Sequence, residues 1–244
     1  MVKAGTIIVA LVALTFSAPV YAAAGAKLEP AGNDVDNTVS LQRGARNFMN
    51  YCSGCHSARY VRFNSVAKGL GLSEDQVIAN LMFNAEKSFE TILAAMPGAD
   101  SARWFGRTPP DLSLMARARG TDYIYNYLKG FYLDPNSPTG VDNVILAGTS
   151  MPHVLWELQG FQRAVFAEVP KQGPVFEHFE PFSTGSLSSE EYDSFVRDTV
   201  NFMEYIAEPE RSARRKLGVW VLMFLTVFLV ISSMLKKQIW KDVS

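Results

Sequence analysis

The sequence has few cysteines and almost no net charge. Only two cysteines occur in 244 residues, too few for the disulfide framework of a small secreted domain. Lysine plus arginine (23) nearly balances aspartate plus glutamate (24), which argues against a basic protein that binds nucleic acid. Hydrophobic residues make up 48% of the chain, which excludes an intrinsically disordered protein. Much of this apolar content lies in two segments.

The first apolar segment has the layout of a secretory signal peptide. Lys3 supplies a positive charge, residues 6–16 are apolar apart from two threonines, and small residues follow up to Ala24. An apolar run of about a dozen residues is short for a membrane span. The sequence therefore predicts a signal peptide over residues 1–22.

The second apolar segment, residues 217–235, has 19 residues and no charge. A helix rises about 1.5 Å per residue, so this run just crosses a hydrocarbon core of about 30 Å. Basic residues flank both ends, and Trp220 and Trp240 lie near the ends, where interfacial aromatics are found. We predict a single transmembrane anchor that leaves residues 23–216 in the periplasm and residues 236–244 as a cytoplasmic tail. The membrane would be the inner membrane of a bacterium.

Helical periodicity dominates the exported part. Apolar residues recur at helical spacing from about Ser40 into the two cysteines. Ser73-x-x-Gln76 and Ser188-x-x-Glu191 are capping boxes that open two further helices. Period-2 alternation is scarce. We therefore expect a mainly α fold: one helical domain with long loops, followed by one C-terminal membrane helix.

Several connecting segments are also predicted. Residues 96–111 and 134–152 are rich in proline and glycine and are expected to be loops. Residues 23–36 are expected to form a mobile, acidic leader. Asp122 is the expected N-cap of a short helix that ends at Gly130.

One motif carries chemistry. Cys52-Ser-Gly-Cys55-His56 is a C-x-x-C-H sequence, which is typical of covalent attachment of a c-type haem. Two thiols three residues apart on a helical turn can each form a thioether to one haem vinyl group. The next residue, His56, can then bind the iron as the proximal axial ligand.

Three other readings of the motif compete. A thioredoxin-like redox pair uses C-x-x-C but normally follows a strand of a βαβ unit, and no such unit surrounds Cys52. A disulfide between Cys52 and Cys55 is compatible with an oxidising compartment. A zinc ion would need about four ligands, so His153 or His178 would have to join the motif.

The sixth ligand of the iron is open on the residues alone. Methionines inside predicted helices are assigned to the core, because methionine is a common core filler. Met96 and Met151 lie in predicted loops, each before a proline, and a loop thioether can reach the open face of a haem. His153 is the rival, and it would give a lower potential than methionine ligation.

At this point the chain resembles the cytochrome c1 family over roughly residues 36–244. The resemblance rests on short motifs along the whole exported part and the anchor: Gln42-Arg-Gly44, Cys52-Ser-Gly-Cys-His-Ser-Ala-Arg-Tyr60, Trp104-Phe-Gly106, Pro109-Pro-Asp-Leu-Ser-Leu-Met-Ala-Arg-Ala-Arg119, Asp122-Tyr123, Gly130-Phe-Tyr132, Met151-Pro-His-Val-Leu-Trp156 and the Lys236-Lys-Gln-Ile-Trp-Lys241 tail.

The resemblance implies a set of ligands for one covalent haem c. Met151 would be the distal axial ligand opposite His56. Arg119 would lie near a haem propionate, and the Pro109–Pro110 loop would pack against the haem. Some bacterial members carry an extra cysteine pair, which this chain lacks.

The resemblance also implies a function. A membrane-anchored c-type cytochrome would relay single electrons from a Rieske iron–sulfur protein to another c-type cytochrome, within a quinol–cytochrome c reductase complex of the respiratory chain. Cytochrome b would be a further partner, and the complex would be dimeric. Such a subunit needs no acid, base or nucleophile and has no independent catalytic activity. The alternatives are a free-standing membrane-anchored cytochrome c that serves another chain or an oxidase, and a haem-free periplasmic thiol–disulfide protein.

An acidic stretch precedes the anchor. Nine acidic residues and a single basic one, Arg197, lie between Gln172 and Glu210. Such a stretch can steer a basic electron-transfer partner. It can equally be an ordinary solvated helix face.

Overall fold

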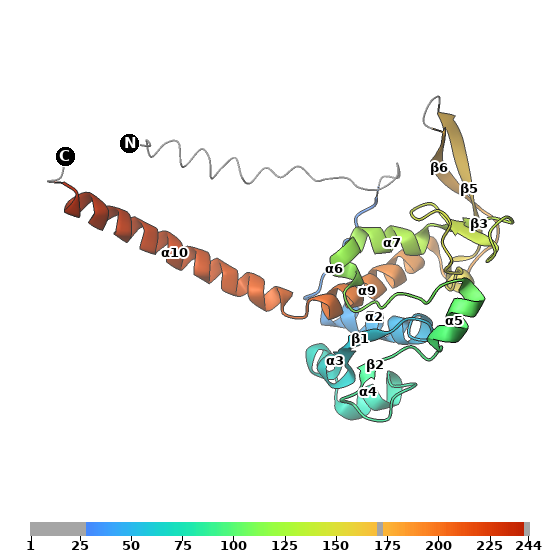
Figure 1. Cartoon of the computed structure of the whole chain (residues 1–244), viewed down its shortest axis with the longest axis horizontal. Helices are drawn as coiled ribbons and strands as arrows, with labels where there is room; N and C mark the ends of the chain where they lie inside the picture. Colours follow the sequence, from blue (N-terminus) through green and yellow to red (C-terminus); the bar gives the residue numbers. More distant parts are fainter. Residues whose placement is uncertain (1–27, 170–172, 242–244) are drawn as a thin grey trace.

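Two helices form the centre of the domain. The computed structural model describes residues 28–169 and 173–241, so the predicted signal peptide lies outside the described residues. Helix α2 (Thr38–Tyr51) and helix α9 (Ser189–Ala207) pack against each other in antiparallel directions (Figure 1). The apolar residues of α9 recur at helical spacing, and the face that they form is buried against α2 and the shorter helices.

A close approach and a polar network hold α2 to α9. Gly44 lies so near α9 that a Cβ atom there would stand 2.0 Å from the carbonyl oxygen of Asp198. The buried carboxylate of Asp198 accepts hydrogen bonds from the hydroxyl of Ser40 (2.6 Å) and from Nε of Arg43 (2.5 Å). The network fixes the position of α2, which carries the C-x-x-C-H motif at its end.

Replacing Gly44 by alanine is expected to lower the free energy of unfolding by about 1–3 kcal/mol, because the added methyl forces the two helices apart. Thermal or denaturant unfolding of the detergent-solubilised chain measures the effect. Gly98→Ala is the control, since a Cβ atom there would meet only ordinary contact, 3.7 Å from the methyl group of Thr108. Equal stability of the two variants would contradict the close approach.

Shorter elements surround the central pair. The helices are α3 (Phe63–Leu70), α4 (Glu74–Asn80), α5 (Gly98–Phe105), α6 (Met115–Arg119), α7 (Thr121–Lys129) and α8 (Trp156–Gln159). The strands form three antiparallel pairs: β1 (Ala58–Arg62) with β2 (Thr91–Ile92), β3 (Phe131–Leu133) with β4 (Val141–Asn143), and β5 (Gln162–Val169) with β6 (Gly173–Pro181). These strands are short or peripheral, which confirms the predicted mainly α-helical class.

Local signals in the sequence were reliable guides to two helices. Both predicted capping boxes are present: Ser73 and Gln76 open α4, and Ser188 and Glu191 open α9. The helix predicted from Ser40 into the cysteines is α2, although it ends just before them.

Two predicted loops and the leader require correction. The segment 96–111 contains the helix α5, because Pro97 precedes its first turn and Gly106, at φ 75°, ends it. The segment 134–152 contains strand β4. Residues 28–36 of the expected mobile leader are packed onto the domain. Ala31 is fully buried there, and its backbone N–H donates to the carboxylate of Asp122 (2.8 Å).

Asp122 is therefore not the N-cap of its helix. Helix α7 begins one residue earlier, after Gly120, whose φ of 88° turns the chain directly from α6 into α7. The carboxylate of Asp122 is engaged by the packed segment around Ala31 instead. The predicted end of the helix at Gly130 is confirmed.

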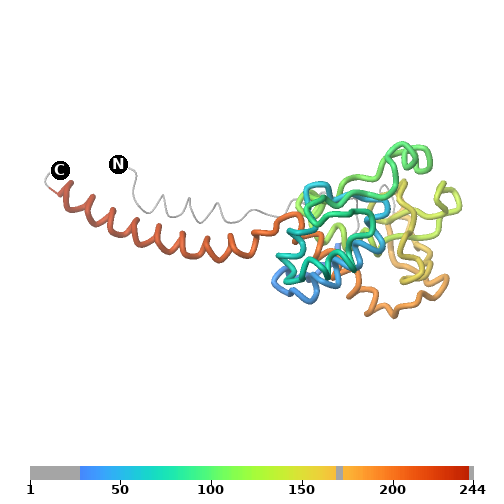
Figure 2. Tube along the Cα trace, turned by 90° about the horizontal axis from the view of Figure 1, so that it is seen from below, coloured from blue at the N-terminus to red at the C-terminus, as the bar shows by residue number. Residues whose placement is uncertain are grey.

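The last helix, α10 (Arg211–Ile239), extends away from the domain in both views (Figures 1 and 2). It contains the predicted span 217–235 and is long and apolar enough to cross a membrane, since an 18-residue window within it has a mean hydropathy of 2.3. No residue of the helix is buried against the rest of the described chain. Its apolar surface is therefore compatible with membrane anchoring.

Ion pairs change the interpretation of the acidic stretch. Four of its nine carboxylates face cations of the chain itself: Asp193 with Lys129, Asp198 with Arg43, Glu204 with Arg211, and Glu208 with Arg117 and Arg214. These pairs join α9 to α2, α6, α7 and the start of α10. Nearly half of the carboxylates in the stretch thus make internal contacts, which weakens the expectation that it steers a basic partner.

Candidate haem site

The end of α2 presents the C-x-x-C-H motif as a compact turn. The backbone N–H of Cys52 donates to the carbonyl of Phe48 (2.9 Å), and that of His56 donates to the carbonyl of Cys52 (2.8 Å). The hydroxyl of Ser53, between the cysteines, donates back to Met49 (2.8 Å). Cys52, Cys55 and His56 all line one cavity as a result.

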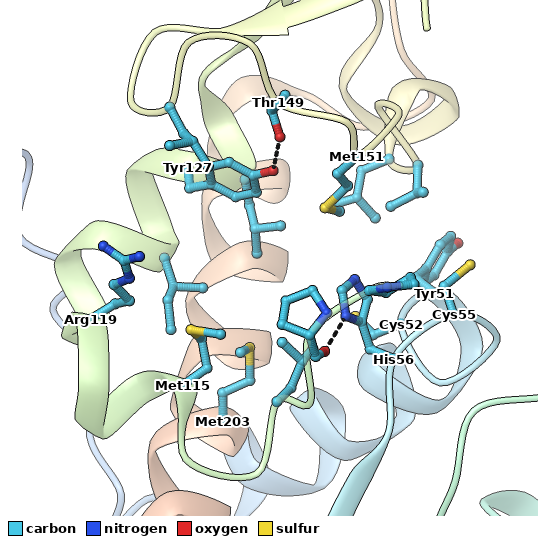
Figure 3. Close-up of a pocket in the computed structure, with 18 of the residues that line it drawn as sticks. Tyr51, Cys52, Cys55, His56, Met115, Arg119, Tyr127, Thr149, Met151 and Met203 are labelled. Carbon is cyan, nitrogen blue, oxygen red and sulfur yellow. Dashed lines mark hydrogen bonds between the residues drawn. The ribbon is translucent and has the colours of Figure 1, made fainter. Parts of the chain in front are cut away.

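His56 is oriented by the Pro109–Pro110 segment. Its Nδ1 lies 2.8 Å from the carbonyl oxygen of Pro110, which leaves Nε2 as the nitrogen able to bind a metal (Figure 3). Burial lowers the pKa of His56 below its ordinary value, although the Pro110 carbonyl acts in the opposite direction. A neutral imidazole is the form that ligates iron.

Asp111 fixes the loop that carries Pro110. Its carboxylate accepts the backbone N–H of Arg59 (2.9 Å), the guanidinium of Arg59 (3.2 Å) and the backbone N–H of Ser113 (2.9 Å). Burial acts to raise the pKa of Asp111, but these hydrogen bonds hold it below its ordinary value. The orienting carbonyl of Pro110 is thereby anchored to strand β1.

The cavity has a volume of about 510 Å³, within the usual range for cofactor sites. Its walls come from the end of α2, the Pro109–Pro110 loop, α6, α7, the segment before α8, and α9. Apolar and aromatic side chains predominate in the lining, among them Leu112, Met115, Tyr123, Ile124, Tyr127, Leu128, Val154, Leu155, Phe195 and Met203. Such a lining favours an apolar group over water.

Met151 is the candidate sixth ligand that reaches this cavity. Figure 3 shows its side chain across the cavity from His56. The rivals do not line it. The backbone N–H of Met96 donates to the carbonyl of Gly54 (3.0 Å), and its side chain is not part of the cavity wall. His153 is 5% exposed and stacks on the ring of Phe131, with a centroid distance of 5.1 Å.

Arg119 lies at the opposite end of the cavity from the cysteines (Figure 3). Its side chain is exposed, and its guanidinium stands 5.5 Å from the ring centroid of Tyr123. Haem propionates stand on the edge of the macrocycle opposite the vinyl groups. Arg119 is therefore on the side where propionates would lie if both cysteines hold the vinyl positions.

The competing readings of the motif find little support. Cys52 and Cys55 form no disulfide. Burial raises the pKa of Cys52 to about 12, and burial also raises the pKa of Cys55 above its ordinary value. A redox-active thiol needs the opposite shift. Among the described residues, no three His, Cys, Asp or Glu side chains gather into a possible zinc site. Covalent attachment of both thiols agrees best with this environment.

Sequence reasoning missed much of the cavity wall. Met115 and Met203, assigned to the core, line the cavity, as do Tyr127, Thr149 and Phe195. The helical period of α9 places Phe195 and Met203 on its apolar face. The period does not distinguish a face that packs on protein from one that packs on a cofactor, because both environments select apolar side chains.

Together, the C-x-x-C-H turn, the oriented histidine, the apolar cavity and the methionine across it define a c-type cytochrome domain, here followed by an apolar helix able to span a membrane. The comparisons specify the family. The model of the Cytochrome C1 family matches residues 33–243, so the chain belongs to that family.

Three relatives illustrate the similarity. The chain is 45% identical to cytochrome c1 of Allochromatium vinosum, over 90% of this chain and 91% of the relative. It is 42% identical to a protein named ammonia monooxygenase gamma subunit of Nitrosomonas europaea, over 89% of both chains. It is 30% identical to cytochrome c1 of Rhodospirillum rubrum, over 83% of this chain and 81% of the relative.

Membership of the family establishes the general role. The cofactor is a single covalently bound haem c, and the protein is a membrane-anchored electron-transfer subunit of the respiratory cytochrome bc1 complex. The residues around the cavity fit this cofactor, since the thiols, the imidazole and the apolar walls converge on one space.

Proposed function

We propose that this chain relays single electrons from a Rieske iron–sulfur protein to a c-type cytochrome within a quinol–cytochrome c reductase complex. The observation that carries the proposal is the convergence of Cys52, Cys55, His56 and Met151 on one apolar cavity, in a chain that also carries an apolar anchor helix. The bound haem supplies reversible one-electron chemistry. The protein's own task is to hold and tune it.

Each ligand has a distinct role in this proposal. Cys52 and Cys55 would hold the haem through two thioether bonds, and His56 would bind the iron through Nε2. Met151 would be the second iron ligand, and a methionine there would give a higher potential than a second histidine. The rings of Tyr127 and Phe195 and the side chain of Met203 keep water from the site.

The anchor places the site next to its donor. In this proposal residues 1–22 are removed after export, residues 23–216 face the periplasm of a bacterial cell, α10 crosses the inner membrane beside cytochrome b, and residues 236–244 remain in the cytoplasm. By family resemblance, the complex would be a dimer. The uncharged run 217–235 and its basic flanks support the membrane crossing, and the signal-peptide layout of residues 1–22 supports the orientation.

Purification from membranes in mild detergent tests the proposal. A pyridine haemochrome spectrum is expected to give one c-type haem per chain, and a b-type haem and a 2Fe–2S signal are expected to co-purify with it. A chain with haem c but neither companion would contradict the Rieske relay. It would favour a free-standing cytochrome, or an assembly such as the one named for the Nitrosomonas relative. A chain without covalent haem would contradict the proposal entirely.

Arg119→Gln is expected to lower the midpoint potential by some tens of mV, because removing a cation near the propionates favours the oxidised, more positive haem. A redox titration at low ionic strength measures the shift. Arg103→Gln is the control, because Arg103 is an exposed arginine on α5 paired with Asp100. Equal potentials in all three proteins would contradict a role for Arg119 at the propionates.

A further inference from the structure

The loop that leads to Met151 is fastened by one carboxylate. Oδ1 of Asp142, on strand β4, accepts the backbone N–H groups of Asn143 (2.8 Å), Gly148 (2.8 Å) and Thr149 (3.2 Å). The hydrogen bonds from Gly148 and Thr149 close residues 142–149 into a ring. At the loop tip, Leu146 is 45% exposed and lines the cavity instead of packing within the loop. Internal packing of the loop tip therefore contributes little to its position.

A second contact holds the loop from above the cavity. The hydroxyl groups of Tyr127, on α7, and Thr149 lie 2.7 Å apart (Figure 3). Thr149 is 7% exposed and stands two residues before Met151. A hydroxyl in such a buried place needs a partner, and its loss costs more than a bond at the surface.

Tyr127 is itself rigidly placed. Its ring stacks on Tyr123 with a centroid distance of 6.3 Å and meets Phe131 edge to face at 5.2 Å. Its carbonyl accepts a hydrogen bond from the side chain of buried Asn143 (2.8 Å), which joins α7 to β4 beside Asp142. Asp142 and Tyr127 therefore hold the same loop from two elements that are bonded to each other.

We propose that Asp142 and Tyr127 form a latch that keeps Met151 on the distal side of the haem. The inference rests on the proposed ligation by Met151. Both are positioning residues that act through the backbone and hydroxyl of Thr149. Since the two cysteines of the chain belong to the haem motif, no disulfide within the chain can do this work. The latch would determine the fraction of molecules in which Met151 is displaced from the iron and the site is open.

Binding of imidazole to the oxidised full-length protein in detergent measures that opening, because a competing ligand enters only when Met151 is displaced. Its apparent affinity is proportional to the open fraction. Tyr127→Phe and Thr149→Val are each expected to raise the affinity about fivefold, the equivalent of one net hydrogen bond of about 1 kcal/mol. Asp142→Asn, which weakens two loop bonds, is expected to raise it at least as much.

Two further variants separate hydrogen bonding from shape. Valine keeps the branched form of Thr149 without its hydroxyl, whereas Thr149→Ser keeps the hydroxyl without the methyl group. Serine is therefore expected to remain close to wild type. The double variant Tyr127→Phe/Thr149→Val is expected to open the site no more than either single variant, since both remove the same bond and the double variant leaves no buried hydroxyl without its partner. Tyr125→Phe, on the same helix but outside the cavity, is the control for loss of a hydroxyl.

The outcomes divide cleanly. An imidazole affinity unchanged in Tyr127→Phe and Thr149→Val, with a normal sulfur-to-iron absorption band that depends on Met151, overturns the latch alone. A Thr149→Ser protein as open as Thr149→Val overturns the hydrogen-bonding role in favour of shape. A band that survives Met151→Leu overturns both the ligation and the latch. A variant that fails to load haem is replaced by the other member of the pair, since either removes the bond.

Discussion

Replacing Met151 by leucine is expected to lower the midpoint potential by a few hundred mV, since axial ligands set haem potentials over a range of about 0.8 V. Leucine fills the same space in the cavity but has no sulfur to bind the iron. A thioether favours the reduced state, and its loss removes that preference. The weak sulfur-to-iron absorption band of the oxidised protein should vanish with it. A redox titration followed by visible spectroscopy measures both effects in one sample.

Met96→Leu is the matched control, because Met96 is the other loop methionine before a proline and does not line the cavity. Its potential and band should remain those of wild type. A protein that loses the band in Met96→Leu and keeps it in Met151→Leu would move the ligand to Met96. His153 could replace Met151 only if its ring left the stack with Phe131, which would expose a buried aromatic cluster.

The parts of the fold that the sequence predicts well are those fixed within a few residues. A capping box is a reciprocal pair of hydrogen bonds across three residues, so Ser73 and Ser188 could be identified without tertiary context. The C-x-x-C-H motif is equally local. The uncharged run 217–235 needs only its length and flanks to predict a helix able to span a membrane.

The remaining features depend on distant partners. Asp122 is a residue type favoured at N-caps and lies near the start of a helix. Its carboxylate, however, accepts a hydrogen bond from the backbone N–H of Ala31, 91 residues away. Pro97 and Gly106 predicted a loop, although the same two residue types also delimit a short helix, and only packing decides between them. The β5–β6 hairpin pairs Phe166 with Phe176 but buries neither face well, so its strands lack clear alternation.

The candidate site shows the same division. Cys52, Cys55 and His56 are readable because the motif is contiguous. On the residues alone Met151 is one of three candidates; the family resemblance favours it, and its position across the cavity agrees. Tyr127 gave no signal, since its role depends on a hydroxyl 22 residues further along the chain. Side chains that position a ligand residue often lie far from it in the sequence. Short-range sequence patterns therefore do not identify them.

Removing both thiols, in Cys52→Ala/Cys55→Ala, is expected to abolish covalent haem and to prevent accumulation of the folded chain. The cavity lies beside the central α2–α9 pair, with about 510 Å³ to fill. At about 24 cal/mol per Å³, an empty cavity of that size would cost on the order of 12 kcal/mol, an upper estimate because the cavity opens to solvent. Domains are stable by only about 5–15 kcal/mol, so the loss would consume most of the stability.

Immunoblots of membranes and a haem stain on denaturing gels measure the two effects separately. Ser53→Ala is the matched control, because it changes the same turn and removes one buried hydrogen bond to Met49 but leaves both thiols. That variant should keep its haem and lose only about 1 kcal/mol. A double-cysteine variant that accumulates to wild-type levels without haem would show that the helices close the cavity unaided. The haem would then contribute little to the stability of the fold. Contacts among α6, α7 and α9 would hold the apolar walls of the cavity together without it.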